Sequence, residues 1–336
     1  MLASFITALA GPELTPSEAS VLSETRPCGI ILFARNVQHP DQIRRLTDGA
    51  REAVGDDILV LIDQEGGRVR RLLPPHWREL PPAAAYGRLY AGDREKACNA
   101  ARLAARLTAA ELRALGINTN CAPVLDVPVA GSHEIVGDRA YGCDPGIVGT
   151  LGAAVAEGYL AGGVLPVIKH LPGHGRATAD SHLDLPVVTA DIAELDATDF
   201  AAFRLLAHLP AAMTAHVVFA AIDPDRPASI SPRVTAEIIR GAIGFRGLLM
   251  SDDLNMKALA GPVAERAKSV LAAGSDLALL CSGDLSQTEA VAAVAPPLEG
   301  EALRRFEHAR AVFRQQEPFD VAEAEAALAL ALRTYA

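Results

Sequence analysis

Short apolar runs that are rich in branched side chains and bounded by turn residues recur along the whole chain. Strands that are buried on both faces of a parallel sheet give such continuous runs, whereas half-exposed strands alternate apolar and polar residues. Eight runs fit this description, at residues 3–8, 29–34, 58–64, 119–126, 164–170, 211–218, 247–252 and 277–281. Helical patterns with apolar residues at i, i+3 and i+4 lie between most of them, for example at 94–115, 193–207 and 263–273.

Eight strands that alternate with helices predict an α/β fold that closes into a (β/α)₈ (TIM) barrel. An open, doubly wound sheet more often shows fewer strands and a glycine-rich phosphate turn. Neither G-x-G-x-x-G nor G-x-x-x-x-G-K-[ST] occurs in the chain. The proline-rich pieces at 74–82 and 296–299 are too short to be flexible linkers. We therefore expect residues 1–336 to form a single barrel domain.

Composition and charge narrow the class of function. The chain has 31 lysines and arginines against 41 aspartates and glutamates, which gives a net charge of −10. This charge disfavours binding to nucleic acids or anionic membranes, so small-molecule chemistry becomes the leading class. The five cysteines are scattered and form no C-x-x-C pair, and the first 25 residues contain no basic residue that would open a signal peptide. No apolar run is long enough to span a membrane. We expect a cytoplasmic protein.

Charged residues interrupt the apolar runs at their C-terminal ends. These residues are Asp63, Asp126, Lys169, His170, His216, Asp252 and Asp253. In a barrel, all of these ends lie on one rim, and active sites are built there from several strands. Any one of these residues could belong to an ordinary loop. The set together predicts a polar cleft.

The segment 169–186 concentrates three histidines and two aspartates and allows two interpretations. In the first, His170, His174 and His182 bind a divalent metal with the aspartates, although the spacing matches no standard zinc motif. In the second, Asp180 and His182 form a dyad. The carboxylate fixes the tautomer of the imidazole and raises its basicity, so that His182 serves as a general acid and then as a general base. A plain loop role is the third possibility.

A carboxylate is the best-placed candidate nucleophile. No G-x-S-x-G motif supports serine chemistry. Asp252 follows an apolar strand and should point into the barrel mouth, where nearby cations would keep it ionised. The candidate cations are Lys169, Arg71 and Arg139. The adjacent Asp253 would face away if the strand pleat continues.

At these residues the chain resembles the bacterial β-N-acetylglucosaminidases of glycoside hydrolase family 3. The resemblance is carried, in order along the chain, by the segments GIILFARN (29–36), IDQEGGRVRRL (62–72), VGDRAYGCDP (136–145), KHLPGHGRATADSHLDLP (169–186), MTAHVVFAAIDPDRPASIS (213–231) and GFRGLLMSDDLNM (244–256). It implies a barrel without the second α/β domain of many larger members. It also implies a retaining mechanism in which Asp252 forms a covalent glycosyl-enzyme and the Asp180–His182 pair acts as acid and base.

The same resemblance implies a binding set and a biological role. The residues expected to bind N-acetylglucosamine are Asp63, Arg71, Arg139, Lys169 and His170. We expect no cofactor and no bound metal. The resemblance to the short members of the family implies peptidoglycan recycling, in which the enzyme releases N-acetylglucosamine from fragments that end in 1,6-anhydro-N-acetylmuramic acid. The expected partner is therefore a saccharide or muropeptide substrate, and we expect a monomer.

Three alternatives remain open at this point. Histidine in place of an acidic general acid reduces repulsion toward an anionic acceptor, so phosphorolysis could replace hydrolysis. A metal-dependent barrel hydrolase is the second alternative. The third is a sugar-binding barrel without catalytic activity, against which the intact Asp252, Asp180 and His182 argue.

Overall fold

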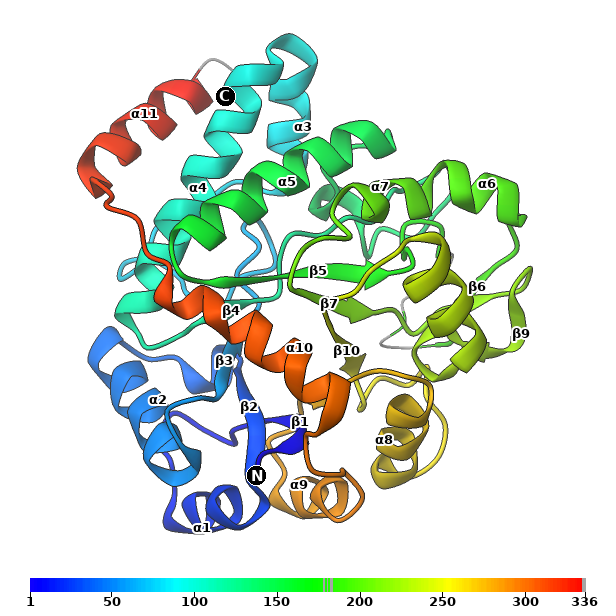
Figure 1. Cartoon of the computed structure of the whole chain (residues 1–336). Helices are drawn as coiled ribbons and strands as arrows, with labels where there is room; N and C mark the ends of the chain where they lie inside the picture. The colour runs from blue at the N-terminus through cyan, green and yellow to red at the C-terminus, as the bar shows by residue number, and fades with distance from the viewer. Residues whose placement is uncertain (178, 180, 182–183, 334–336) are drawn as a thin grey trace.

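The computed structural model describes residues 1–177, 179, 181 and 184–333. Its centre is a closed barrel in which every neighbouring pair of strands is parallel, in the order β1-β11-β10-β7-β5-β4-β3-β2 (Figure 1). The barrel strands are β1 (Ala3–Ala8), β2 (Pro27–Leu32), β3 (Leu59–Ile62), β4 (Thr119–Asn120), β5 (Leu165–Leu171), β7 (Ala211–Thr214), β10 (Leu248–Asp253) and β11 (Leu277–Leu280). The predicted (β/α)₈ fold is confirmed, and each of the eight predicted runs overlaps a barrel strand.

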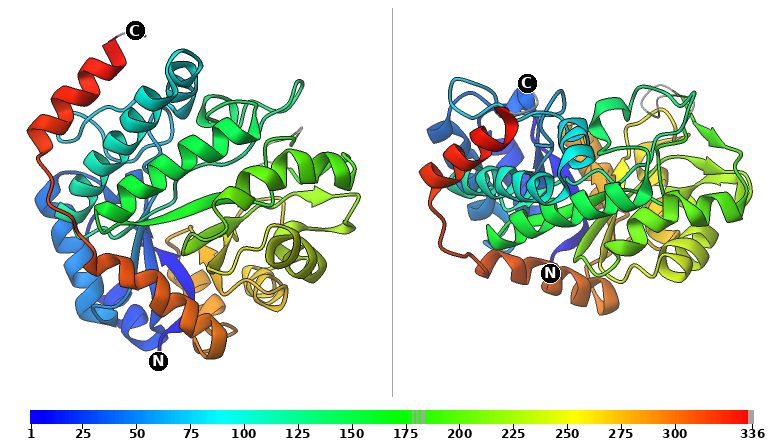
Figure 2. Two further views of the ribbon diagram at one scale, coloured as in Figure 1. Left: turned by 45° about the horizontal axis from the view of Figure 1, so that its top comes forward. Right: turned by 90° about the horizontal axis from the view of Figure 1, so that it is seen from above.

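Helices form the outer layer of the barrel (Figure 2). They are α1 (Pro16–Thr25), α2 (Pro40–Val54), α3 (Ala83–Gly92), α4 (Arg94–Ala114), α5 (Pro145–Ala161), α6 (Ile192–Ala197), α7 (Asp199–Leu205), the π-helix η4 (Val234–Ala242), α8 (Val263–Ala272), α9 (Leu285–Ala292), α10 (Gly300–Arg310) and α11 (Val321–Arg333). A small sheet beside the barrel contains β6 (Val187–Val188), β8 (Val218–Phe219) and β9 (Asp223–Pro227). In the described part of the chain, no helix combines the length and the apolar character that crossing a membrane requires.

Local sequence explains where several helices begin. The side chains of Asp93 and Asp144 accept hydrogen bonds from the backbone N–H groups of Lys96 (3.0 Å) and Ile147 (2.9 Å), so each satisfies an otherwise unpaired donor in the first turn of α4 or α5. Proline at the first position of α5 adds a backbone torsion that already suits a helix.

Two elements differ from the sequence prediction. The predicted helix at 193–207 is divided at Thr198 into α6 and α7, where Thr198 Oγ1 lies 2.7 Å from Asp199 Oδ2 and the buried Asp199 pairs with Arg176 (2.6 Å). This buried ion pair fixes the position of Asp199, and the helix is interrupted there although the local apolar spacing favours a continuous one. The predicted strand at 119–126 is regular only over β4, because Pro123 has no N–H to donate to the ladder.

The two apolar layers of the barrel come from alternating strand residues. Ile6, Ile31, Leu61, Val167 and Met250 lie in the cluster that fills the barrel interior. Their neighbours along each strand face outward and pack against the helices. This alternation leaves no room for charge inside the barrel, so charged side chains are confined to its ends.

Candidate active site

A cavity of about 440 Å³ lies at the C-terminal ends of the barrel strands. The structure brings six of the predicted site residues together in its lining, which are Asp63, Arg71, Arg139, Lys169, His170 and Asp252. Asp180 and His182, the predicted acid/base pair, lie outside the described residues. Five of the seven predicted rim residues therefore line one polar cavity, whereas Asp126 and His216 are not part of its lining. The chemical role of each residue stays a prediction.

Lys169 is the centre of the ion-pair network on one side of the cavity. This residue lies near the C-terminal end of β5, its side chain is only 3% exposed, and its Nζ lies 2.8 Å from Asp63 Oδ1 and 2.7 Å from Glu65 Oε1. Burial by itself would lower the pKa of Lys169, but the two carboxylates outweigh burial and raise it. Lys169 is therefore a permanent cation at the floor of the cavity.

Two arginines complete this network. Arg139 donates from Nε and Nη2 to the two oxygens of Glu65 (2.9 and 2.8 Å), and Arg71 Nη2 lies 3.1 Å from Asp63 Oδ2. Burial opposes ionisation of Glu65, yet Lys169 and Arg139 lower its pKa to about 2. The pKa of Asp63 is also lowered, because Lys169 and Arg71 outweigh the effect of burial. Both carboxylates are ionised at neutral pH.

Glu65 is a site residue that the sequence reasoning missed. It lies in the quoted 62–72 segment, two positions after Asp63, and both side chains reach Lys169. The available signal was this two-residue spacing, since alternate residues of an extended segment point to the same side.

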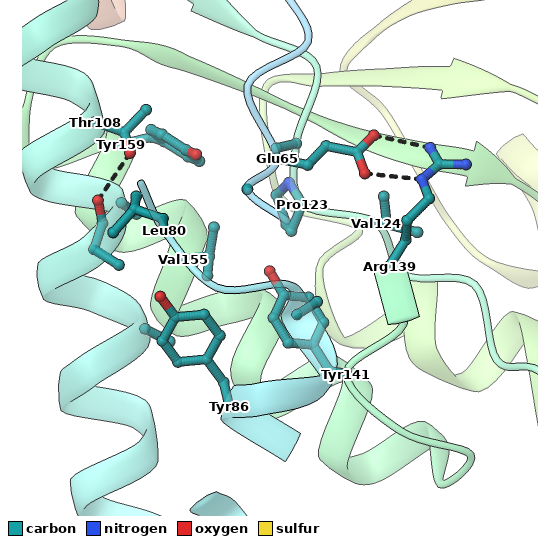
Figure 3. Close-up of a pocket in the computed structure, with 16 residues that line it drawn as sticks. Glu65, Leu80, Tyr86, Thr108, Pro123, Val124, Arg139, Tyr141, Val155 and Tyr159 are labelled. Carbon is teal, nitrogen blue, oxygen red and sulfur yellow. Dashed lines mark hydrogen bonds and ion pairs between the residues drawn. The ribbon is translucent and has the colours of Figure 1, made fainter. Parts of the chain in front are cut away.

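Behind the Glu65–Arg139 pair lies a second, smaller cavity with room for about 30 Å³ (Figure 3). Its walls include Tyr86, Tyr141 and Tyr159, and the hydroxyl of Tyr86 has no hydrogen-bond partner among the described residues. This volume is enough to hold ordered water and is far too small for a sugar ring. The larger cavity at the rim is therefore the candidate substrate site.

His170 is oriented by a buried carboxylate. Its Nδ1 lies 2.6 Å from Oδ2 of Asp126, whose Oδ1 accepts hydrogen bonds from the backbone N–H groups of His170 (3.2 Å) and His174 (2.7 Å). Burial opposes ionisation of Asp126, but His170 outweighs it and the pKa of Asp126 is lowered. With Nδ1 engaged in this way, Nε2 is the nitrogen of His170 available to a ligand.

His174 plays a structural part in the described chain. Burial lowers the pKa of His174 to about 4, so the ring is neutral at pH 7, and its Nε2 lies 2.9 Å from Ser181 Oγ. The next residue, Gly175, packs tightly against the backbone of Val127. A Cβ at this position would lie 2.1 Å from the carbonyl oxygen of Val127. Only glycine allows the loop after β5 to approach the loop after β4 in this way.

The two aspartates that end β10 have different environments. Asp253 Oδ1 accepts hydrogen bonds from the backbone N–H groups of Asn255 (2.9 Å) and Cys281 (3.0 Å), and burial raises the pKa of Asp253. Asp253 is expected from the sequence to face away from the site if the strand pleat continues; the register shifts near the end of β10, and Asp253 lines the cavity together with Asp252. Asp252 Oδ1 in turn accepts a hydrogen bond from the backbone N–H of Asp253 (2.8 Å), so backbone groups hold both carboxylates.

His216 supports this end of β10 from the neighbouring strand. The ring is fully buried, with Nδ1 2.6 Å from Ser229 Oγ and Nε2 3.0 Å from the carbonyl oxygen of Asp253. Burial lowers the pKa of His216. A neutral ring that bridges two fixed groups holds the backbone of the aspartate pair in place.

The described part of the chain contains no preformed cluster of metal ligands of the kind that the metal hypothesis requires. Within these residues, no three histidine, cysteine or acidic side chains are grouped as metal ligands. His170 Nδ1 and His174 Nε2 already face Asp126 and Ser181. Neither nitrogen could bind a metal without breaking its present contact.

Comparisons with known proteins agree with this geometry. The model of the glycosyl hydrolase family 3 N-terminal domain matches residues 6–311. The chain is 37% identical to a β-hexosaminidase of Pseudomonas aeruginosa over 94% of its own length and 95% of the relative's. It is 39% identical to a β-hexosaminidase of Alkalilimnicola ehrlichii, with 88% of this chain and 84% of the relative covered.

Solved structures give the same result. NagZ from Neisseria gonorrhoeae in complex with N-trifluoroacetyl-D-glucosamine superposes with a TM-score of 0.88 at 31% identity, covering 99% of this chain and 97% of that one. A family 3 β-N-acetylglucosaminidase from Paenibacillus gives a TM-score of 0.86 at 31% identity, covering 98% of this chain and 66% of the larger relative. The chain therefore belongs to glycosyl hydrolase family 3 and is a glycoside hydrolase.

Proposed function

We propose that this enzyme is a retaining β-N-acetylglucosaminidase that acts as a single catalytic unit on peptidoglycan fragments. Its substrate would be N-acetylglucosamine linked to 1,6-anhydro-N-acetylmuramic acid, with or without the peptide. The observation that carries the proposal is the position of Asp252 in the ring of strands: β10 lies diametrically across the barrel order from β3, which Asp63 follows. A nucleophile on one side and hydroxyl-binding groups on the other can hold one hexose between them.

The network around Lys169 suits sugar hydroxyls. Each oxygen of Asp63 accepts one charge-assisted hydrogen bond, from Lys169 or from Arg71, so each keeps acceptor capacity for a hydroxyl. We assign hydroxyl binding to these three residues, to His170 through Nε2 and to Arg139. Glu65 is a positioning residue, because it fixes both Lys169 and Arg139. The relatives named β-hexosaminidase and the sugar analogue bound to NagZ support N-acetylhexosamine as the glycone.

The chemical steps follow from these assignments. A carboxylate oxygen of Asp252 attacks the anomeric carbon while the bond to the leaving oxygen breaks, and His182, oriented by Asp180, donates a proton to that oxygen. In the second step His182 takes a proton from water. The water oxygen bonds to the anomeric carbon and Asp252 is released as a carboxylate. The stereochemistry at the anomeric carbon is retained because it is inverted twice.

Trapping the intermediate tests the nucleophile. A 2-acetamido-5-fluoro glycosyl donor should label Asp252, as peptide mapping by mass spectrometry would show. Asp252→Asn should lose at least about 1,000-fold in kcat, the scale found when an essential catalytic group is removed. Asp253→Asn is the matched control and should not abolish labelling. A label on Asp253, or an active enzyme that takes no label, would contradict the assignment.

Product analysis tests the overall reaction. N-acetylglucosamine should accumulate from the disaccharide with anhydro-N-acetylmuramic acid, and nuclear magnetic resonance should show the β-anomer first. In phosphate buffer, a sugar 1-phosphate would instead indicate phosphorolysis. No turnover of this disaccharide alongside rapid turnover of chitobiose would contradict the proposed recycling role.

The cellular setting is part of the same proposal. All five cysteines are free thiols, which suits a reducing cytoplasm. We assign the enzyme to that compartment and to a monomeric state. Fractionation of cells and light scattering of the purified protein test these two assignments.

A further inference from the structure

Arg35 differs from the other cations of the substrate cavity. Lys169, Arg71, Arg139 and Arg68 also line it, and each forms an ion pair with a carboxylate. Arg35 is exposed and, within the described ranges, has no carboxylate within ion-pair distance. Its positive charge is therefore available to a ligand in the cavity.

The guanidinium of Arg35 is held in place without being neutralised. Its Nε donates to the carbonyl oxygen of Leu9 (2.9 Å) and its Nη2 to that of Cys281 (2.7 Å), at the ends of β1 and β11. Its Cζ also lies 4.8 Å from the centre of the Phe33 ring. Two neutral acceptors and an aromatic face reduce the freedom of the side chain, so less entropy is lost when it binds a ligand.

Asp253, the carboxylate that acts on Arg35, has backbone partners of its own. Asp253 acts electrostatically on Arg35, but its Oδ1 accepts the backbone hydrogen bonds of Asn255 and Cys281. The two hydrogen bonds of Arg35 use Nε and Nη2, which leaves the two hydrogens of Nη1 for an acceptor.

Arg35 lies across the cavity from Lys169, the cation near the C-terminal end of β5. In the ring of strands, β1 is diametrically opposite β5, which carries Lys169. The groups proposed to bind the neutral glycone are contributed from β3 to β5 and the loops that follow them, whereas Arg35 is fixed at β1 and β11. A group of the substrate other than the glycone is therefore needed to interact with the positive charge of Arg35.

We propose that Arg35, supported by Phe33, forms a subsite for a carboxylate on the leaving group of the substrate. This inference rests on the proposed glycosidase function and deepens it, because it names a residue that selects anionic over neutral aglycones. The partner chemistry is a carboxylate because Nη1 and the second hydrogen of Nη2 can meet its two oxygens.

A pair of substrates isolates this contribution. Two aryl N-acetyl-β-D-glucosaminides would carry a carboxylate or a carboxamide at the same position, with substituents chosen to equalise the pKa of the phenols. In the wild-type enzyme, kcat/KM should favour the carboxylate. Arg35→Gln should reduce this preference about twofold to fivefold, through KM, the range expected for an exposed charge pair.

Three controls keep the result specific to charge at residue 35. Arg68→Gln changes a cation of the same cavity that is already paired with Asp138, so it should leave the ratio of the two substrates unchanged. Arg35→Lys should keep part of the preference. Added salt should reduce the wild-type preference because it screens an exposed pair.

The outcomes separate the subsite from the glycosidase function. Equal losses on both substrates in Arg35→Gln, or no change in their ratio, would overturn the subsite. Altered inhibition by free inorganic phosphate with an unchanged ratio would also overturn it, because the anion would then not belong to the leaving group. If the wild-type enzyme cleaves neither glycoside, the proposed function fails. The affinities of the matching thioglycosides would then still test the subsite.

Discussion

At the N-terminal ends of the strands the barrel is covered by apolar side chains, whereas at the C-terminal ends it opens into a cavity lined by ion pairs. Helix α10 crosses the first of these ends (Figures 1 and 2) and buries Phe306 and Ala309 against the first residues of several strands. Residues 296–298 pair with the start of β1, through hydrogen bonds such as that from Leu298 N to Leu2 O (2.8 Å). One end is therefore closed by packing and the other is left open for chemistry.

The two ends of the barrel differ in how their buried side chains contribute to stability. Apolar burial at α10 stabilises the fold and needs no partner, since it depends only on the area removed from water. The charges at the opposite end lose hydration when they are buried, and only their mutual contacts offset that loss. Lys169, Glu65 and Asp63 are consequently interdependent, whereas each apolar residue at α10 acts largely on its own.

The largest expected effect comes from removing the central cation. Lys169→Met should lower the free energy of unfolding by about 3 to 5 kcal/mol, because two buried carboxylates lose their shared partner. It should also reduce kcat/KM at least about 100-fold, since Asp63 loses its orientation. Urea denaturation and a chromogenic N-acetylglucosaminide would measure the two effects.

A matched lysine on the surface provides the control. Lys268→Met removes a pair with Glu265 in which both side chains are more than half exposed, and it should change stability by less than about 1 kcal/mol. A similar, small effect at both lysines would show that the buried network is not interdependent.

A substitution at the closed end of the barrel should lower stability without lowering activity. Phe306→Ala should lower the free energy of unfolding by about 3 to 5 kcal/mol through loss of apolar burial and a new cavity. Because this side chain lies at the far end of the barrel, kcat/KM well below the melting temperature should stay within about twofold of the wild-type value. A large loss of kcat/KM in a folded variant would break the division between the two ends.

A smaller effect should appear in the pH dependence of stability. The pKa of His174 is about 4 in the folded protein, against an ordinary value of 6.5. Between these values the unfolded chain binds more protons, so the free energy of unfolding should fall as the pH is lowered. Each pH unit contributes up to about 1.4 kcal/mol, which amounts to about 1 to 2 kcal/mol between pH 6.5 and pH 5.

The variant His174→Gln isolates this contribution, because it removes the titrating ring. Its unfolding free energy should depend less on pH in the same interval. Equal slopes in the variant and the wild type would contradict burial of a neutral His174.

The barrel and most of its rim could be predicted because both depend on patterns local in sequence. Each apolar run identifies a strand, and the charged residue that ends it falls on the common rim of a parallel barrel. This reasoning placed Asp63, Lys169 and Asp252 at one cavity. The break at Thr198 could not be predicted in the same way, because it depends on a contact between Asp199, the first residue of α7, and Arg176 in the loop after β5.

The sequence alone determined the family, the number of strands and which residues end them, because hydrophobic periodicity and motif spacing are properties of neighbouring residues. Only the tertiary structure showed that Glu65 joins Lys169 to Arg139, that Asp253 lines the cavity and is held by backbone N–H groups, and that Arg35 has no carboxylate within ion-pair distance among the described residues. Ion pairing falls steeply with distance and depends on burial, and both are settled between strands that lie far apart along the chain.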